Sequence, residues 1–123
     1  MTLEFFDTHT HLDLIAEKAE QSEEQIWQRA RQGAVAKALH IGIDWASSRK
    51  ALALAHQLDG VLASIGYHPS IGAEQDNEIP QIMDLARRER ASGNGHFVAI
   101  GEVGLDYYWI EDDKRRQRQR EIF

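Results

Sequence analysis

Cysteine is absent from the 123 residues, which excludes disulfide bonds and metal sites built from thiolates. A chain without cysteine fits a reducing compartment, so we expect a cytoplasmic protein. No run of about 18 apolar residues occurs, so the sequence predicts no transmembrane helix and no membrane partner. The start of the chain also lacks a basic segment followed by an apolar one, and we therefore expect no secretory signal.

An excess of positive charge is lacking as well, because the formal net charge is −6. Proteins that bind nucleic acid through charge alone are usually basic, so the composition predicts no broad phosphate-binding surface. An enzyme that holds phosphate through metal ions does not need such a surface. The net charge therefore leaves the partner open.

Apolar segments typical of strands alternate with amphipathic segments typical of helices along the whole chain. We expect strands at residues 3–8, 35–43, 61–66 and 97–101. We expect helices at 22–32, from Asp44 to about Gly60, at 78–92 and from about 112 onward, with a loop between Tyr67 and about Asn77. Ser22 with Gln25 forms a capping-box pattern, and Asp44 is a plausible N-cap. Four repeats of strand and helix predict a parallel sheet with right-handed crossovers.

The residues that could perform chemistry follow the predicted strands. These are His9 and His11 after the first strand, Asp44 after the second, His68 after the third, and Glu102 and Asp106 after the fourth. A doubly wound sheet would spread them along one edge, whereas a barrel would bring them to one mouth. The combination of two histidines with a glutamate favours a TIM-type (β/α)8 barrel. Such a barrel needs about 250 residues, so we expect residues 1–123 to be the amino-terminal half of one barrel domain, with four of its β/α units, whose carboxy-terminal half is missing.

The most informative segment is Phe-Phe-Asp-Thr-His-Thr-His-Leu-Asp at 5–13. Side chains two positions apart on a strand share a face, so His9 and His11 point the same way. Two imidazoles at the end of one strand can bind one metal ion together. The alternative is a pair of unrelated polar residues where a strand enters a loop.

A carboxylate follows the fourth strand in Ala-Ile-Gly-Glu-Val-Gly-Leu-Asp-Tyr-Tyr at 99–108. Gly101 and Gly104 allow a close turn of the backbone and leave room beside Glu102. Glu102 could bridge two divalent ions, and imidazole with carboxylate ligands suits Zn²⁺, Mn²⁺ or Fe²⁺, while a bridging carboxylate also accommodates Mg²⁺. The alternative for Glu102 is a structural salt bridge. His68, held in extended backbone by Pro69, could bind a phosphate or orient a water, or simply pack on Tyr67.

Other polar and aromatic residues are weaker candidates. Three histidines lie mid-strand, on a helix and in a glycine-rich turn: His40, His56 and His96. Asp112–Arg120 carries five basic residues, which fit a solvated outer helix better than a phosphate-steering patch. Aromatic residues near strand exits could stack on nucleobases, although packing is the default: Trp45, Tyr67, Tyr107, Tyr108 and Trp109.

Three blocks of the sequence together resemble the TatD family of metal-dependent deoxyribonucleases. They are Phe-Asp-Thr-His-Thr-His-Leu-Asp at 6–13, Ile-Gly-Tyr-His-Pro at 65–69 and Ala-Ile-Gly-Glu-Val-Gly-Leu-Asp-Tyr-Tyr at 99–108, with a weaker match of His-Ile-Gly-Ile-Asp at 40–44. The His-x-His pair alone is shared with all amidohydrolase-like barrels, whereas the block at 99–108 is more specific.

The resemblance implies a barrel with a site for divalent ions, two in number, in which His9 and His11 ligate one metal and Glu102 ligates or bridges the pair. It implies hydrolysis of DNA phosphodiester bonds, including single-stranded ends, by a metal-activated water, with His68 helping to hold the phosphate. The remaining ligands of the family, two further histidines and an aspartate, belong to later strands, so we expect this fragment alone to be inactive. Two alternatives stay open: a related metallohydrolase of a small amide or ester, and a non-catalytic fragment that folds with a partner half.

Overall fold

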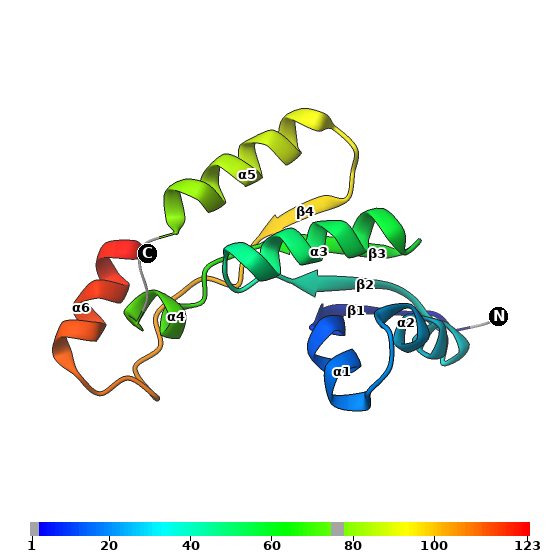
Figure 1. The fold of residues 1–123 in the computed structure, drawn as a ribbon, viewed down its shortest axis with the longest axis horizontal. Helices are drawn as coiled ribbons and strands as arrows, with labels where there is room; N and C mark the ends of the chain where they lie inside the picture. Colours follow the sequence, from blue (N-terminus) through cyan, green and yellow to red (C-terminus); the bar gives the residue numbers. More distant parts are fainter. Residues whose placement is uncertain (1–2, 75–77) are drawn as a thin grey trace.

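Four parallel strands lie side by side in the order β1-β2-β3-β4 (Figure 1). The computed structural model describes residues 3–74 and 78–123. Its strands are β1 (Phe5–Thr10), β2 (Val35–Ile41), β3 (Val61–Ile65) and β4 (Phe97–Ile100). Its helices are α1 (Leu12–Ala19), α2 (Glu23–Gln32), α3 (Trp45–Gln57), α4 (Pro69–Glu74), α5 (Ile79–Ser92) and α6 (Asp113–Ile122).

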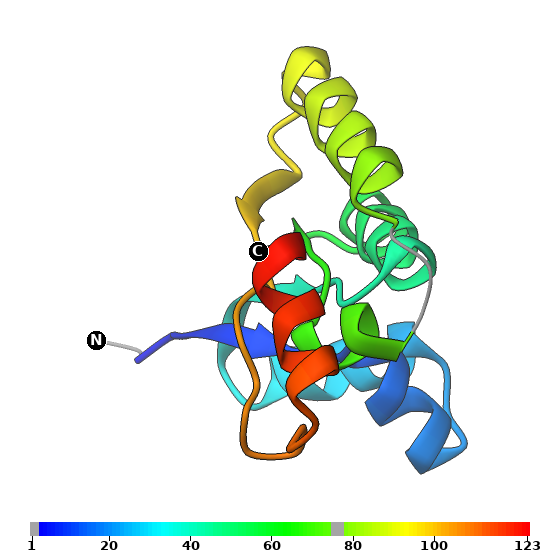
Figure 2. The same cartoon turned by 90° about the vertical axis from the view of Figure 1, so that its left-hand side faces the viewer.

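The order of the strands decides between the two predicted architectures. Because each strand joins the sheet next to the one before it, every crossover runs in the same direction, and right-handed connections then place all helices on one face. Figure 2 shows the helices that connect the strands on one side of the sheet and the other side uncovered. A doubly wound sheet would reverse its direction and carry helices on both faces, so this sheet is part of a barrel wall.

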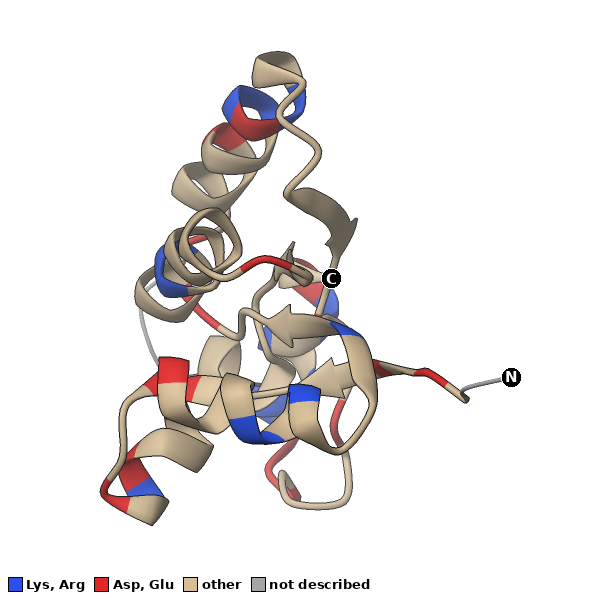
Figure 3. Cartoon of the chain, turned by 90° about the vertical axis from the view of Figure 1, so that its right-hand side faces the viewer, with Lys and Arg blue, Asp and Glu red and all other residues tan. Residues whose placement is uncertain are grey.

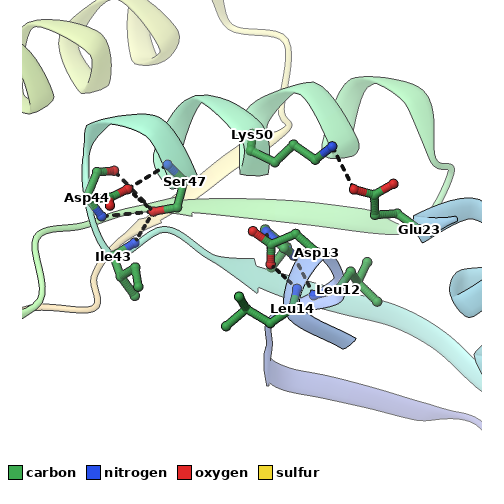
Figure 4. Close-up of polar contacts among 9 residues, drawn as sticks. Leu12, Asp13, Leu14, Glu23, Ile43, Asp44, Ser47 and Lys50 are labelled. Atoms are coloured by element: carbon green, nitrogen blue, oxygen red, sulfur yellow. Dashed lines mark hydrogen bonds and ion pairs between the residues drawn. The ribbon is translucent and has the colours of Figure 1, made fainter. Parts of the chain in front are cut away.

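Local capping signals fix where two of the crossover helices begin. Ser22 Oγ accepts a hydrogen bond from the Gln25 backbone N–H, and Gln25 Oε1 accepts one from Ser22 N–H. At α3 the Asp44 carboxylate accepts from Ser47 N–H at 2.7 Å, while Ser47 Oγ accepts from Asp44 N–H at 2.9 Å (Figure 4). Both predicted N-caps are confirmed, and each such cap stabilises its helix by about 1 kcal/mol.

The core lies between the sheet and its helices. Many of its buried members come from β2, β3 and α3: Ala38, Ala51, Leu52, Leu54, Ala55, Val61, Ala63 and Ile65. At the margin of this core, Lys50 Nζ of α3 lies 2.7 Å from Glu23 Oε1 of α2 (Figure 4). The hydrogen bond from Lys50 lowers the pKa of the Glu23 carboxyl group. This contact therefore joins α2 to α3.

Three elements differ from the sequence-based expectation. The first strand runs from Phe5 to Thr10, two residues later than expected. A helix, α1, follows this strand directly, where we expected no regular structure. Its N-cap residue, His11, makes no side-chain capping bond, and only Leu12 and Ala16 of the helix are buried. The sequence therefore lacks a capping side chain at the start of this helix, although Leu12, Ile15, Ala16 and Ala19 have helical spacing.

The segment after His68 is also helical. It forms α4, which begins at Pro69, a residue favoured in the first turn of a helix. We expected a loop reaching about Asn77, and residues 75–77 of that expectation lie outside the described part of the chain.

Both acidic and basic residues occur on the helices seen in Figure 3. Among the described residues, no helix is long and apolar enough to cross a membrane.

The uncovered face and the two outer strands predict how the 123-residue chain behaves alone. The exposed apolar side chains on β1 and β4 are Phe5, Phe6, Val98 and Ile100, each about half exposed. Unpaired strand edges beside apolar side chains promote association, so we expect the isolated chain to self-associate in sedimentation velocity. A monodisperse monomer that melts cooperatively would contradict this expectation.

Candidate metal centre

The two histidines of the first block lie together at the end of β1. His9 is on the strand and His11 is the residue that precedes α1. Their ring centroids are 5.2 Å apart with an edge-to-face orientation, and the His9 side chain is 55% exposed. The end of β1 and the start of α1 therefore bring the two rings together at the carboxyl edge of the sheet.

Glu102 brings a carboxylate to the same place from the other outer strand. Its Oε2 lies 3.6 Å from His9 Nε2, and the ligand atoms of His9, His11 and Glu102 all lie within 4.8 Å of one another. Metal–ligand bonds of about 2.0–2.2 Å place donor atoms up to about 4.4 Å apart, so small side-chain movements suffice to bind one ion. Two imidazoles and one carboxylate fit a divalent metal in number and chemistry, since catalytic zinc sites use three such ligands.

His68 approaches the other oxygen of the same carboxylate. Its Nε2 lies 3.4 Å from Glu102 Oε1. The Nδ1 atom accepts a hydrogen bond from the Ser70 backbone N–H at 3.2 Å and lies 2.7 Å from Ser70 Oγ. Because Nδ1 is an acceptor, Nε2 carries the proton and is directed toward Glu102. His68 thus presents a hydrogen-bond donor, which suits a carboxylate or a phosphate better than a metal ion.

Backbone contacts between three strand ends hold Glu102 in place. The Glu102 N–H donates to the Gly42 carbonyl at 3.0 Å, and the Gly101 N–H donates to the Ile65 carbonyl at 2.8 Å. Ser64 Oγ donates to the Gly101 carbonyl at 2.6 Å. Gly101 has φ near +150°, a conformation that favours glycine, as its place beside Glu102 predicted.

Gly66 is a contributor that the sequence analysis did not single out. A Cβ atom at this position would lie against Gly101 and Glu102 backbone atoms at a separation that real Cβ atoms do not show. The absence of a side chain at Gly66 therefore lets the chain carrying Glu102 cross the end of β3. Gly66 is part of the Ile-Gly-Tyr-His-Pro block, but the need for glycine there becomes visible only when the segment after β4 is placed against it.

His40 is the second residue whose role the sequence concealed. It is fully buried on β2, opposite Thr10 in the register with β1. Its Nδ1 accepts a hydrogen bond from the Leu12 backbone N–H at 3.0 Å, and its Nε2 lies 3.6 Å from Asp13 Oδ1. His40 is not one of the clustered ligands, yet it fixes the backbone directly after His11. Figure 4 shows Leu12 and Asp13 on the segment so held.

The remaining candidates lie apart from the three donors. Asp106 Oδ1 accepts hydrogen bonds from the Tyr108 and Trp109 backbone N–H groups and so shapes its own loop. Asp44 caps α3. In the described part of the chain, the group able to hold a metal contains neither His56 nor His96, whose rings pack together 4.4 Å apart.

A parallel barrel sheet with two histidines after its first strand and a glutamate after its fourth has the architecture of TIM-barrel metal-dependent hydrolases. The family model for TatD related DNase matches residues 6–123. The chain belongs to this family, and the resemblance inferred from the three sequence blocks is confirmed.

Several known proteins are similar to this chain. It is 34% identical over 118 residues to the uncharacterized metal-dependent hydrolase YabD of Bacillus subtilis, covering 96% of this chain and 43% of that protein. It is 29% identical over 96 residues to the 3'-5' ssDNA/RNA exonuclease TatD of Cronobacter sakazakii, covering 78% of this chain and 35% of that protein. The crystal structure of YjjV, a TatD homolog from Escherichia coli, aligns with a TM-score of 0.74 and 28% identity over 96% of this chain and 43% of that chain.

The chain therefore spans less than half the length of these relatives. Its fold is that of the TatD-type barrel, of which four strands are present, and the predicted fold class is confirmed.

The packing at Gly66 predicts a selective loss of metal binding. In the protein that contains this chain, Gly66→Ala should displace Glu102 and weaken Mn²⁺ binding by about 10–100-fold, the range for residues that orient ligands. Isothermal titration calorimetry measures the affinity. Gly95→Ala is the control, because it places a side chain at a positive φ with open space around it, and so strains the backbone far from the donors. Equal Mn²⁺ affinity for Gly66→Ala and the parent protein would contradict the assignment.

The buried His40 predicts a pH dependence of stability. Burial lowers the pKa of His40 from its ordinary value of 6.5, and the charges of His11 and Lys50 lower it further, against the opposing effects of Asp13 and Glu23. Well above pH 6.5 the ring is neutral in both folded and unfolded chains. As the pH falls below 6.5, the unfolded chain binds a proton that the folded chain resists, so the free energy of unfolding decreases until the pH reaches the folded pKa.

Denaturant unfolding between pH 7.5 and 5 measures this effect. His40→Asn should flatten the decrease, because asparagine does not titrate and its side-chain oxygen can still accept from Leu12 N–H. His56→Asn is the control, since solvent reaches that half-exposed ring in the folded chain. An unchanged slope in His40→Asn would rule out this source of acid sensitivity.

Proposed function

We propose that the protein containing this chain is a metal-dependent hydrolase that cleaves phosphodiester bonds of DNA, and that His9, His11 and Glu102 bind its divalent metal. The observation that carries the proposal is the convergence of these three donors, from opposite edges of the sheet, to within 4.8 Å. The C. sakazakii relative, a 3'-5' ssDNA/RNA exonuclease by name, supports single-stranded nucleic acid as the substrate.

The donor set suits this chemistry because it is open to solvent on one side. His9 and Glu102 keep 55% and 35% of their side-chain surfaces exposed, so the site has room for a substrate and a water. A bound divalent ion supplies Lewis-acid stabilisation of charge on phosphoryl oxygen and makes water easier to deprotonate. The −6 charge of the chain is compatible with this use of a metal, because phosphate need not be gripped by a broad basic surface.

The second proposed role belongs to His68. Its Nε2 proton is directed at Glu102 Oε1 from 3.4 Å, while Ser70 fixes the ring from the Nδ1 side. The same donor can move to a phosphoryl oxygen that enters beside Glu102. His68 would then position the phosphate, and in the free enzyme it would keep the carboxylate oriented for the metal.

Removal of the donors tests the proposal. His9→Ala and Glu102→Ala should each weaken Mn²⁺ binding by at least about 100-fold, because loss of even an outer partner of a ligand costs about 10–100-fold. Hydrolysis of a single-stranded oligodeoxynucleotide with Mg²⁺ or Mn²⁺ should fall by a similar or larger factor. Calorimetry and gel analysis of the products measure the two quantities.

Three controls make the result specific. His56→Ala removes a half-exposed histidine of α3 that is outside the donor cluster and should change neither quantity. Circular dichroism checks that the folds are unchanged. Hydrolysis of cyclic amides and esters, but not of DNA, would indicate the alternative metallohydrolase. Metal binding without hydrolysis of DNA, amides or esters would indicate a non-catalytic protein. Full activity and metal affinity in both donor variants would refute the site.

A further inference from the structure

We propose that Tyr108 and Trp109 form a platform on which a base of single-stranded nucleic acid stacks beside the His9–His11–Glu102 site. The inference rests on the proposed function and extends it to the residues that contact the substrate base. It concerns the aromatic loop, which we define as residues 103–111 between β4 and α6.

The first observation is the exposure of the two rings. Tyr108 is 79% exposed and Trp109 is 77% exposed, whereas Tyr67, another aromatic residue at a strand exit, is 2% exposed and belongs to the core. The Tyr108 and Trp109 rings meet edge to face, with centroids 4.6 Å apart and planes at 89°. Edge-to-face contact fixes the pair and leaves ring faces available for a planar ligand.

The second observation is that the loop is held rigidly rather than left loose. Gln119 of α6 is 1% exposed; its Nε2 donates to the Asp106 carbonyl at 3.0 Å and its Oε1 accepts from Asp106 N–H at 2.7 Å. The Asp106 carboxylate then accepts from Tyr108 and Trp109 N–H at 3.0 and 3.1 Å. A buried amide thus fixes the backbone that carries two exposed aromatic rings. Such preorganisation reduces the entropy lost when a ligand binds.

The third observation is continuity with the candidate metal centre. The lining of one cavity of about 350 Å³ includes His68 and Glu102 together with Asp106, Tyr107 and Tyr108. Trp109 adjoins this lining through its ring contact with Tyr108. A phosphate beside His68 and Glu102 therefore has an aromatic wall next to it. The adjoining base of the same strand is the part of the substrate that this wall can meet.

Charge on the neighbouring helix fits the same ligand. The guanidinium carbons of Arg116 and Arg120 lie 5.0 and 6.0 Å from the centre of the Tyr107 ring, and Arg120 Nη1 donates to the Tyr107 hydroxyl at 2.9 Å. Arg116 also donates to the Tyr107 and Ile110 carbonyls. Two positive charges are thereby kept beside the loop in a chain of net charge −6, which favours a polyanion at this point.

These features together select a single strand over a duplex. Base faces are available for stacking on side chains when they are not already stacked in a helix. Aromatic rings beside local positive charge are the usual construction of sites for single strands.

The test compares an oligothymidylate with the same strand carrying one abasic residue next to the cleaved bond. For the full protein with Mn²⁺, Tyr108→Ala combined with Trp109→Ala should raise KM for the intact strand by between about 5-fold and 150-fold, the range found for loss of one base stack. The kcat should change little. The parent should prefer the intact strand over the abasic one, and the double variant should not.

Matched variants separate stacking from structure. Tyr108→Phe with Trp109→Phe keeps two aromatic faces and should restore most of the preference for the intact strand. Phe123→Ala removes an aromatic residue that is 73% exposed but belongs neither to the aromatic loop nor to the cavity lining, so it should change nothing. If the alanine double variant keeps the parent KM and preference, the platform is refuted while the hydrolase assignment stands.

Tryptophan fluorescence provides a readout that does not require cleavage. The other two tryptophans of the chain are less exposed than Trp109, since Trp27 is 5% exposed and Trp45 is partly buried against the core. Acrylamide should therefore quench Trp109 more strongly, and added oligothymidylate should protect Trp109 and change its emission. Trp109→Phe should remove the response. If Trp109 is already shielded from acrylamide in the free protein, another part of the protein covers it and the platform is refuted. If no phosphodiester is cleaved, the proposed function fails. In that case a fluorescence response to oligothymidylate that is lost in Tyr108→Ala would still support the platform. The absence of any fluorescence response in the parent protein would refute the platform.

Discussion

The site depends on the close backbone contact of three successive strand ends. Glu102 can face His9 only because the chain after β4 lies directly against the ends of β2 and β3, through hydrogen bonds to Gly42 and Ile65. That approach requires a residue without a side chain at Gly66. Parallel strands bring their carboxyl ends to one edge; here the glycines convert that general property into a defined position for one carboxylate.

The second support of the site is a buried polar contact. The Nδ1 atom of His40 accepts a hydrogen bond from the Leu12 N–H. The backbone immediately after His11 is therefore anchored to β2 as well as to β1. A buried imidazole that lacks such a bond would destabilise the fold. Its second nitrogen faces Asp13 from 3.6 Å, too far for a strong hydrogen bond. The ring is therefore kept neutral by burial, which makes this anchor sensitive to acid.

Some parts of this arrangement can be predicted from the sequence because they depend on short-range rules. The shared face of His9 and His11 follows from the two-residue period of a strand, and the starts of α2 and α3 follow from capping residues that satisfy their own neighbours. Glu102 stands out because glycines flank it. Each of these signals is complete within a few residues of the chain.

Other parts could not be predicted because they depend on contacts between distant segments. Helix α1 has no capping side chain, and its buried face consists of Leu12 and Ala16, so its stability comes from packing. In the sequence His40 is an ordinary mid-strand histidine, and its contact with Leu12 becomes visible only when β1 is placed beside β2. Gly66 reads as an ordinary turn residue until the backbone of Glu102 crosses it. In all three cases the missing information is the identity of the neighbour.

Contacts between distant segments also explain why similar aromatic residues differ in burial. Tyr67 and Tyr108 both follow a strand that ends at the carboxyl edge, and composition does not distinguish them. Tyr67 precedes a segment that folds back as α4 and buries it, whereas Tyr108 lies in a loop whose backbone bonds are satisfied by Asp106. Once a loop satisfies its own hydrogen bonds, its side chains need not enter the core. Tyr108 lines the same cavity as Glu102, so its ring is available to a ligand in that cavity and not to the core, as the proposed platform requires.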